Sequence, residues 1–145
     1  MESICKTAEE LKALAANMAS HAKAGDVFAI TGNLGAGKTT FAQGFINSLL
    51  EKEENITSPT FNIIQLYHSK KDGQGSSTPI YHCDLYRIKN INEAINLGIE
   101  DTFHGAITLI EWPEVAASIL PRNTISIEIH TFAGDHRKVV VRSGV

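Results

Sequence analysis

The chain has 145 residues, 43% of them hydrophobic and 20% charged, and its formal net charge is -3. This length and composition are typical of one ordinary globular domain, so we expect residues 1–145 to form a single domain. The acidic balance and the lack of a lysine or arginine cluster argue against independent tight binding to nucleic acid.

Signals for export or for membrane insertion are missing from the sequence. The first residues lack the basic and apolar regions of a signal peptide, and no apolar stretch is long enough to span a bilayer. Cys5 and Cys83 suit a reducing compartment, and we expect them to be buried or inert thiols rather than a disulfide. The expected location is therefore cytoplasmic, with no membrane partner.

The first predicted element is an amphipathic helix near the N-terminus. Thr7 and Glu10 have the spacing of a capping box. Apolar residues then follow on one helical face: Leu11, Leu14, Ala15 and Met18. We expect Gly25 to end this helix.

The next segment has the pattern of a loop that binds nucleotide phosphates. Residues 32–39 read Gly-Asn-Leu-Gly-Ala-Gly-Lys-Thr and satisfy G-x-x-x-x-G-K-[ST]. The apolar run 26–31 before it predicts a buried strand, and the spacing of apolar residues in 40–50 predicts a helix. Glycines let the backbone N–H groups of such a loop converge on a polyphosphate, and the helix points its positive dipole end at the same place.

We expect this loop and the start of its helix to bind the nucleotide. The residues concerned are Asn33, Leu34, Gly35, Ala36, Gly37, Lys38, Thr39 and Thr40. The motif predicts that Lys38 reaches the β- and γ-phosphates and that the Thr39 hydroxyl binds Mg²⁺. Without nucleotide, we expect Lys38 to be solvated and to pack against little.

Strand and helix patterns alternate through the rest of the chain. The predicted helices begin at Asn90, with Gly98 as the end, and at Pro113, before Pro121. The predicted strands are residues 60–68, 79–85, 106–110, 125–130 and 138–142, with 69–78 as a loop. This order predicts an α/β fold of the P-loop NTPase type: a central, mostly parallel sheet flanked by helices, with antiparallel strands added at the C-terminal end.

Two acidic residues and one short segment are candidates for chemistry beyond binding. Asp84 and Glu111 each end a strand-like run, and the carboxyl ends of parallel strands line the ligand crevice of an open α/β sheet. Either acid is equally well read as a solvated loop residue. Residues 58–60, Ser-Pro-Thr, lie where order–disorder switches often occur, or they form a turn before an edge strand.

Five segments, in order between Gly25 and Pro121, closely resemble the TsaE family, formerly called YjeE. They are Gly-Asn-Leu-Gly-Ala-Gly-Lys-Thr-Thr from Gly32, Ser-Pro-Thr-Phe from Ser58, His-Cys-Asp-Leu-Tyr-Arg from His82, Gly-Ile-Glu-Asp from Gly98 and Glu-Trp-Pro-Glu from Glu111. The resemblance implies a small P-loop ATPase of bacterial threonylcarbamoyladenosine synthesis in tRNA. It also implies ATP and Mg²⁺ as cofactors, TsaD and TsaB as partners, contact with tRNA through that complex, and hydrolysis that resets the complex.

The resemblance also implies roles for particular residues. Thr39 and Glu111 would hold Mg²⁺, Asp84 would support the metal or the attacking water, and residues 58–60 would act as a switch. From the residues alone, the Thr60 hydroxyl could cap either the γ-phosphate or Mg²⁺. Lys38 completes the catalytic set.

The resemblance implies one further site residue and shows one departure from the family. Thr7 would lie near the adenine end of the site in addition to capping a helix. Asn33 stands where the family usually has aspartate, which leaves the loop geometry intact but removes a charge. The strands beyond Pro121 match only weakly.

Two other function classes stay open from the residues alone. A small-molecule kinase usually supplies several arginines from a lid, and this chain has few arginines and no such insertion. A GTPase-like switch would suit Thr60, but no Asn-Lys-x-Asp segment is present to read guanine.

Three further residues have ordinary interpretations beside functional ones. Trp112 is either a partner-facing anchor or a core residue. Arg87 either contacts a phosphate or TsaD, or pairs with a nearby acid. His82 is expected to be a satisfied strand residue rather than a base.

Overall fold

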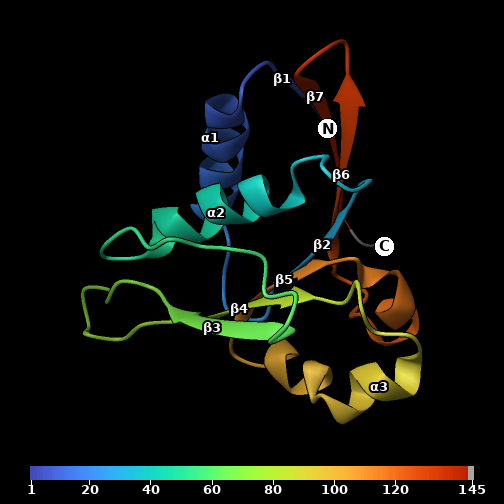
Figure 1. The fold of residues 1–145 in the computed structure, drawn as a ribbon. Helices are drawn as coiled ribbons and strands as arrows, with labels where there is room; N and C mark the ends of the chain where they lie inside the picture. Colours follow the sequence, from blue (N-terminus) through green and yellow to red (C-terminus); the bar gives the residue numbers. More distant parts are fainter. Residues whose placement is uncertain (144–145) are drawn as a thin grey trace.

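A computed structural model describes residues 1–143, and a seven-stranded sheet runs through it (Figure 1). The strands are β1 (Glu2–Cys5), β2 (Val27–Thr31), β3 (Ile64–His68), β4 (Pro79–Asp84), β5 (Ile107–Glu111), β6 (Ile125–Phe132) and β7 (His136–Arg142). The helices are α1 (Ala8–Ala19), α2 (Lys38–Leu49) and α3 (Ile91–Asn96), with the 3₁₀ helices η1 (Ile99–Phe103) and η2 (Pro113–Ile119). None of these helices is long and apolar enough to cross a membrane.

The sheet is parallel in its centre and antiparallel at both edges. Its strand order is β1-β7-β6-β2-β5-β4-β3. Strand β2 pairs in parallel with β5 and β6, and β5 pairs in parallel with β4. The C-terminal strands β6 and β7 pair antiparallel, which confirms the predicted fold class. At the opposite edge, β3 and β4 form an antiparallel hairpin across the predicted loop 69–78.

Each face of the sheet is covered by its own helices (Figure 1). Helices α1 and α2 cover one face, where Phe41 and Phe45 of α2 pack with Phe28 and Ile30 of β2 in one buried cluster. Helix α3 and the 3₁₀ helices cover the other face over a second cluster: Val27, Cys83, Leu85, Ala94, Ile99, Ile110 and Ala116. Because successive strand residues point to opposite faces, the continuous apolar runs of β2 and β5 supply both clusters.

The main differences from the predicted elements concern α1, β3, residues 113–119 and β1. Helix α1 ends at Ala19, and Gly25 instead donates its N–H to Ala106 O at 2.7 Å, at the start of the central strands. Strand β3 begins only at Ile64, because residues 60–63 form a turn that closes on Pro59. Residues 113–119 form a 3₁₀ helix, and β1 is a four-residue edge strand with too few residues to give a pattern.

The two cysteines are free and buried, as expected. Cys5 lies under α1, and Cys83 is fully buried in the second cluster. Burial raises the pKa of the Cys83 thiol to about 12, so this thiol stays protonated and unreactive near neutral pH.

Gly44→Ala is expected to reduce the free energy of unfolding by about 1–3 kcal/mol, as overpacking does. Gly44 faces α1, and a Cβ there would lie 2.5 Å from Lys12 Cα and 2.6 Å from Lys12 O. Helix propensity alone would favour alanine by about 1 kcal/mol, so the sign of the change reports the packing. Urea denaturation measures it.

Gly73→Ala is the matched control, because a Cβ at this loop position would have no neighbour within 4 Å. Its free energy of unfolding should change by less than about 0.5 kcal/mol. A Gly44→Ala variant at least as stable as the parent would contradict the close approach of α1 and α2.

Candidate nucleotide-binding site

The glycine-rich loop joins the end of β2 to the start of α2. Gly32 lies so close to β6 that a Cβ would be 2.6 Å from Ile129 O, so no larger residue fits there. Gly37 is the N-cap of α2 at φ 113, a conformation that favours glycine, and it gives the helix no side-chain cap. The first N–H groups of a 12-residue helix are therefore free to bind an anion.

Lys38 is buried rather than solvated, which corrects the expectation from sequence. Its side chain is 5% exposed, and Nζ donates to Gly32 O at 2.6 Å and to Asn33 O at 2.8 Å. The same ammonium lies 4.2 Å from the ring centre of Trp112, a cation–π contact. Burial lowers the pKa of Lys38, while the nearby Glu111 carboxylate opposes this shift. The loop's own carbonyls thus hold the ammonium where phosphate oxygens are expected to bind.

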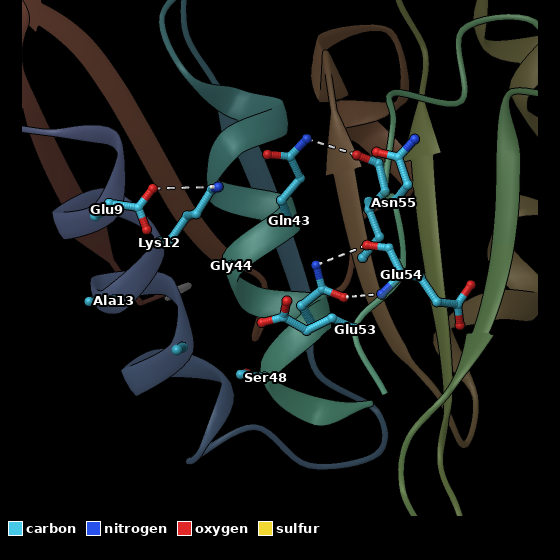
Figure 2. A pocket seen from close by; sticks show the side chains of 12 residues that line it. Glu9, Lys12, Ala13, Gln43, Gly44, Ser48, Glu53, Glu54 and Asn55 are labelled. Carbon is cyan, nitrogen blue, oxygen red and sulfur yellow. Dashed lines mark hydrogen bonds and ion pairs between the residues drawn. The ribbon is translucent and has the colours of Figure 1, made fainter. Parts of the chain in front are cut away.

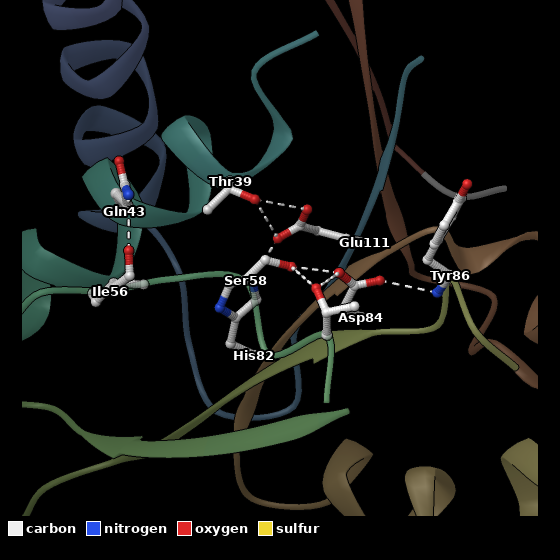
Figure 3. A network of polar contacts seen from close by, with 9 residues as sticks. Thr39, Gln43, Ile56, Ser58, His82, Asp84, Tyr86 and Glu111 are labelled. Carbon is white, nitrogen blue, oxygen red and sulfur yellow. Dashed lines mark hydrogen bonds and ion pairs between the residues drawn. The ribbon is translucent and has the colours of Figure 1, made fainter. Parts of the chain in front are cut away.

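Glu111 is a buried carboxylate at the end of β5, held from two sides (Figure 3). The Thr39 hydroxyl donates to it, with 3.1 Å to Oε1 and 3.3 Å to Oε2. On the other side, His82 Nε2 lies 2.6 Å from Glu111 Oε2. Since an ionised carboxylate can only accept, Nε2 carries the hydrogen of this bond.

Asp84 binds the predicted switch segment. Its Oδ2 accepts hydrogen bonds from the hydroxyls of Ser58 and Thr60, the latter at 3.4 Å. Its Oδ1 accepts the N–H of Tyr86 at 2.9 Å. Asp84 is 5% exposed and pairs in register with Glu111 across the parallel strands β4 and β5. Both acids are therefore buried and hydrogen-bonded on neighbouring strands, and neither is a solvated loop residue.

A cleft of about 440 Å³ brings most of the predicted residues together. From the loop and α2 it is lined by Leu34, Gly35, Gly37, Lys38, Thr39 and Thr40, and from other elements by Ser58, Thr60, Asp84 and Glu111. Asn33 and Ala36 line an adjoining hollow on the β6 side of the loop. Thr7 lines neither hollow; it caps α1 by accepting the N–H of Glu10 at 3.1 Å.

Sequence reasoning missed Tyr86 and Arg137. Tyr86 lines the cleft beside Trp112, and their ring centres are 4.9 Å apart. Arg137 of β7 donates to Ala36 O at 2.7 Å and to Gly35 O at 3.3 Å, so a C-terminal strand supports the loop. Trp112, expected to be either a partner-facing anchor or a core residue, is a wall of the cleft, and Arg87 lies over the ring of Phe61, at 5.0 Å.

Some of these contacts had a signal in the sequence. The i, i+2 spacing of His82 and Asp84 puts both side chains on one face of a strand, a signal that could have pointed to the position of His82 near the acids. Arg137 had no local signal, because its loop partners lie about a hundred residues earlier.

A separate hollow, of about 550 Å³, lies away from the cleft, between α1, α2 and residues 53–56 (Figure 2). Side chains on α2 fasten this segment: Gln43 donates to Ile56 O at 2.8 Å, and Asn47 exchanges two hydrogen bonds with the backbone of Glu54. Residues 54–56, just before the predicted switch segment, are therefore hydrogen-bonded to α2 beside this hollow.

Two oxygen-bearing side chains in the cleft have the chemistry of Mg²⁺ ligands. Thr39 and Glu111 supply hydroxyl and carboxylate oxygens, the hard ligands that this ion prefers. Within residues 1–143, no three His, Cys, Asp or Glu side chains are grouped to hold a metal by themselves. One or two protein oxygens are nevertheless the usual protein share of an Mg²⁺ site completed by phosphates and water.

Comparisons with known proteins show what this chain is similar to. The model of the family described as "Threonylcarbamoyl adenosine biosynthesis protein TsaE" matches residues 5–139. The TsaE of Rickettsia bellii is 36% identical over 139 residues, which cover 94% of this chain and 90% of that protein. The TsaE of Bacillus subtilis is 40% identical over 132 residues, covering 90% and 78% respectively.

A solved structure shares the fold as well. The crystal structure of Bacillus subtilis YdiB superposes with a TM-score of 0.80 and 32% sequence identity, covering 100% of this chain and 86% of that one. The family match spans both the glycine-rich loop and the strand-end acids. This chain therefore belongs to the TsaE family, whose members take part in tRNA threonylcarbamoyladenosine biosynthesis.

Proposed function

We propose that this protein is a Mg²⁺-dependent ATPase that works with TsaD and TsaB, and that its hydrolysis of ATP resets their complex. The observation that carries the proposal is the hydrogen bond from Thr39 to the buried Glu111 carboxylate, beside the uncapped start of α2. These groups form one cleft with Lys38 and the predicted switch segment. An anion-binding helix end beside a hard oxygen pair suits a nucleotide triphosphate bound with its metal.

The loop's own groups would bind the phosphates. The free N–H groups at the start of α2 would donate to phosphate oxygens, and Lys38 would exchange two neutral carbonyl acceptors for charged ones. Thr39 and Glu111 would hold Mg²⁺, which when bound neutralises charge on the phosphates.

Asp84 would then have two roles that alternate. Its Oδ2 accepts from the Ser58 and Thr60 hydroxyls, so these hydroxyls must leave Asp84 to reach a γ-phosphate. Their departure would free a carboxylate oxygen to accept a hydrogen bond from water in the same cleft. This exchange gives residues 58–60 a physical basis for switching.

Two features of the cleft favour a partner: no arginine lines it among the described residues, and exposed apolar side chains surround it. Among residues 1–143, no arginine lines the cleft, so none is placed there to stabilise transferred charge. Leu34 and Tyr86 at its wall are 70% and 52% exposed, and Phe61, just past Thr60, is 85% exposed. A partner that covers these side chains could exclude water and order the switch segment.

Lys38→Ala is expected to weaken ATP binding by about 100-fold or more, or ~2.7 kcal/mol. The variant should stay folded, with a loss of about 1 kcal/mol in unfolding free energy. The loss is small because the two carbonyls that lose the Lys38 donor lie beside the cleft, where water can replace it. Calorimetric titration with ATP and urea denaturation measure the two effects. Lys71→Ala, in an exposed loop, is the matched control. A folded Lys38→Ala variant with near-normal ATP affinity would contradict the assignment of the loop.

Glu111→Ala and Thr60→Ala are expected to bind ATP but to hydrolyse it at least about tenfold more slowly. Glu111→Ala should also raise the Mg²⁺ concentration needed for activity. Asp84→Ala should act in the same direction. Steady-state phosphate release at several Mg²⁺ concentrations measures these effects, with the exposed Glu100→Ala as control. Parent-like turnover by Glu111→Ala and Thr60→Ala would remove both residues from the mechanism.

Isolated protein is expected to hydrolyse ATP slowly, and TsaD–TsaB to accelerate it about tenfold or more by completing the site. The acidic chain should bind a basic surface of the TsaD–TsaB complex, and tRNA would compete for the same surface. ATP turnover is measured at one salt concentration for the isolated protein, for the protein with TsaD–TsaB, and for that mixture with tRNA added. Phe61→Ala should lose stimulation while keeping ATP affinity, whereas Leu97→Ala, on the α3 side, should not. Full activity alone, without response to either partner, would overturn this mechanism.

A further inference from the structure

His82 is a polar residue where packing alone would favour an apolar one. It lies in β4 and is 0% exposed, with Leu109 of β5 and Gln65 of the edge strand β3 as its register partners. Its face of the sheet carries the first apolar cluster, which includes Ile80 and Leu109. Burying an imidazole among such residues costs free energy unless its nitrogens are paired.

Only one of the two ring nitrogens of His82 is paired within residues 1–143. Nε2 lies 2.6 Å from Glu111 Oε2, and Nδ1 is buried with no hydrogen-bond partner. A residue present only for stability would be expected to satisfy both nitrogens, and buried unpaired polar atoms usually have another explanation. The expectation that His82 is a fully satisfied strand residue is therefore wrong for Nδ1. The only side-chain hydrogen bond that His82 makes among the described residues is therefore the one to Glu111.

The second support of Glu111, the Thr39 hydroxyl, would turn to the metal in the proposed function. Thr39 lines the cleft at the first turn of α2, whereas His82 is fully buried in the sheet. If the hydroxyl turns to a ligand, only His82 still fixes the orientation of the carboxylate. Outer partners that orient a ligating group in this way typically contribute 10- to 100-fold in metal affinity, by an order-of-magnitude estimate.

We propose that His82 is a positioning residue: its Nε2–H holds Glu111 Oε2, so that the carboxylate is already oriented for a divalent cation before nucleotide and metal bind. The inference rests on the proposed function, in which Glu111 is a metal ligand. It assigns His82 no contact with the nucleotide or with the metal.

The test separates metal affinity from nucleotide affinity. ADP binding is measured by calorimetry in EDTA, and Mn²⁺ binding to the protein–ADP complex is measured from the electron paramagnetic resonance signal of free Mn²⁺. His82→Leu keeps the volume and removes the donor. His82→Gln keeps an N–H donor at a similar reach. Cys83→Ala, next to it but in the opposite cluster, controls for a cavity in β4. Thermal unfolding of every variant checks folding.

His82→Leu should weaken Mn²⁺ binding in the complex by about 10-fold or more, with ADP affinity in EDTA unchanged within about twofold. His82→Gln should recover most of the Mn²⁺ affinity, and Cys83→Ala should keep all of it. A His82→Leu variant with parent-like Mn²⁺ affinity would overturn the inference. So would equal losses in His82→Gln and His82→Leu, or, if His82→Leu does not fold, a folded His82→Gln that binds Mn²⁺ 10-fold more weakly.

Glu111→Ala distinguishes failure of this inference from failure of the proposed function. If Glu111→Ala weakens Mn²⁺ binding and His82→Leu does not, only the positioning role fails. If Glu111→Ala itself binds Mn²⁺ like the parent, Glu111 is not a metal ligand, and both the metal site of the proposed function and the role of His82 fail together.

Discussion

A carboxylate buried at the end of the central parallel strand is the constraint on which this site depends. Glu111 is 2% exposed, and a carboxyl group with so little exposure needs hydrogen-bonding partners of fixed geometry. The partners come from two separate elements: Thr39 from α2 and His82 from β4. Thr39 and His82 can both reach Glu111 because β2, β5 and β4 pair in parallel. This pairing brings the glycine-rich loop and the acidic strand ends together at the carboxyl ends of these strands.

Close packing behind the loop keeps α2 in place for these contacts. Gly44 lets α1 approach the backbone of α2, and Gly32 lets the loop lie against Ile129 O of β6. Arg137 bonds two loop carbonyls from β7. The antiparallel C-terminal strands, which carry little local signal of function, thus support the loop from behind. Side chains outside the cleft therefore contribute to how well the loop is organised in advance of any ligand.

The sequence predicted the elements whose pattern is local, and it failed where partners are distant. The loop motif, β2 and α2 follow each other within about twenty residues, so pattern and structure agree there. Strand β1 has four residues, and nothing in them shows that β7 pairs with it. The burial of Lys38 was also invisible, because it depends on the fold of the loop around its carbonyls and on Trp112. The strand-end acids could be predicted as candidates, but only the tertiary structure shows that they lie side by side on neighbouring strands and line one cleft.

The polar groups of the cleft are paired with one another in the structure. Lys38 binds loop carbonyls, the hydroxyls of Ser58 and Thr60 bind Asp84, and Thr39 binds Glu111. A nucleotide that binds here must exchange each of these internal contacts for a new one, so only the difference between them contributes to affinity. In the proposed function the same exchange would also favour release, since the cleft would return to satisfied contacts when the nucleotide left. A site built in this way suits a cycle that must be reset repeatedly better than it suits permanent binding.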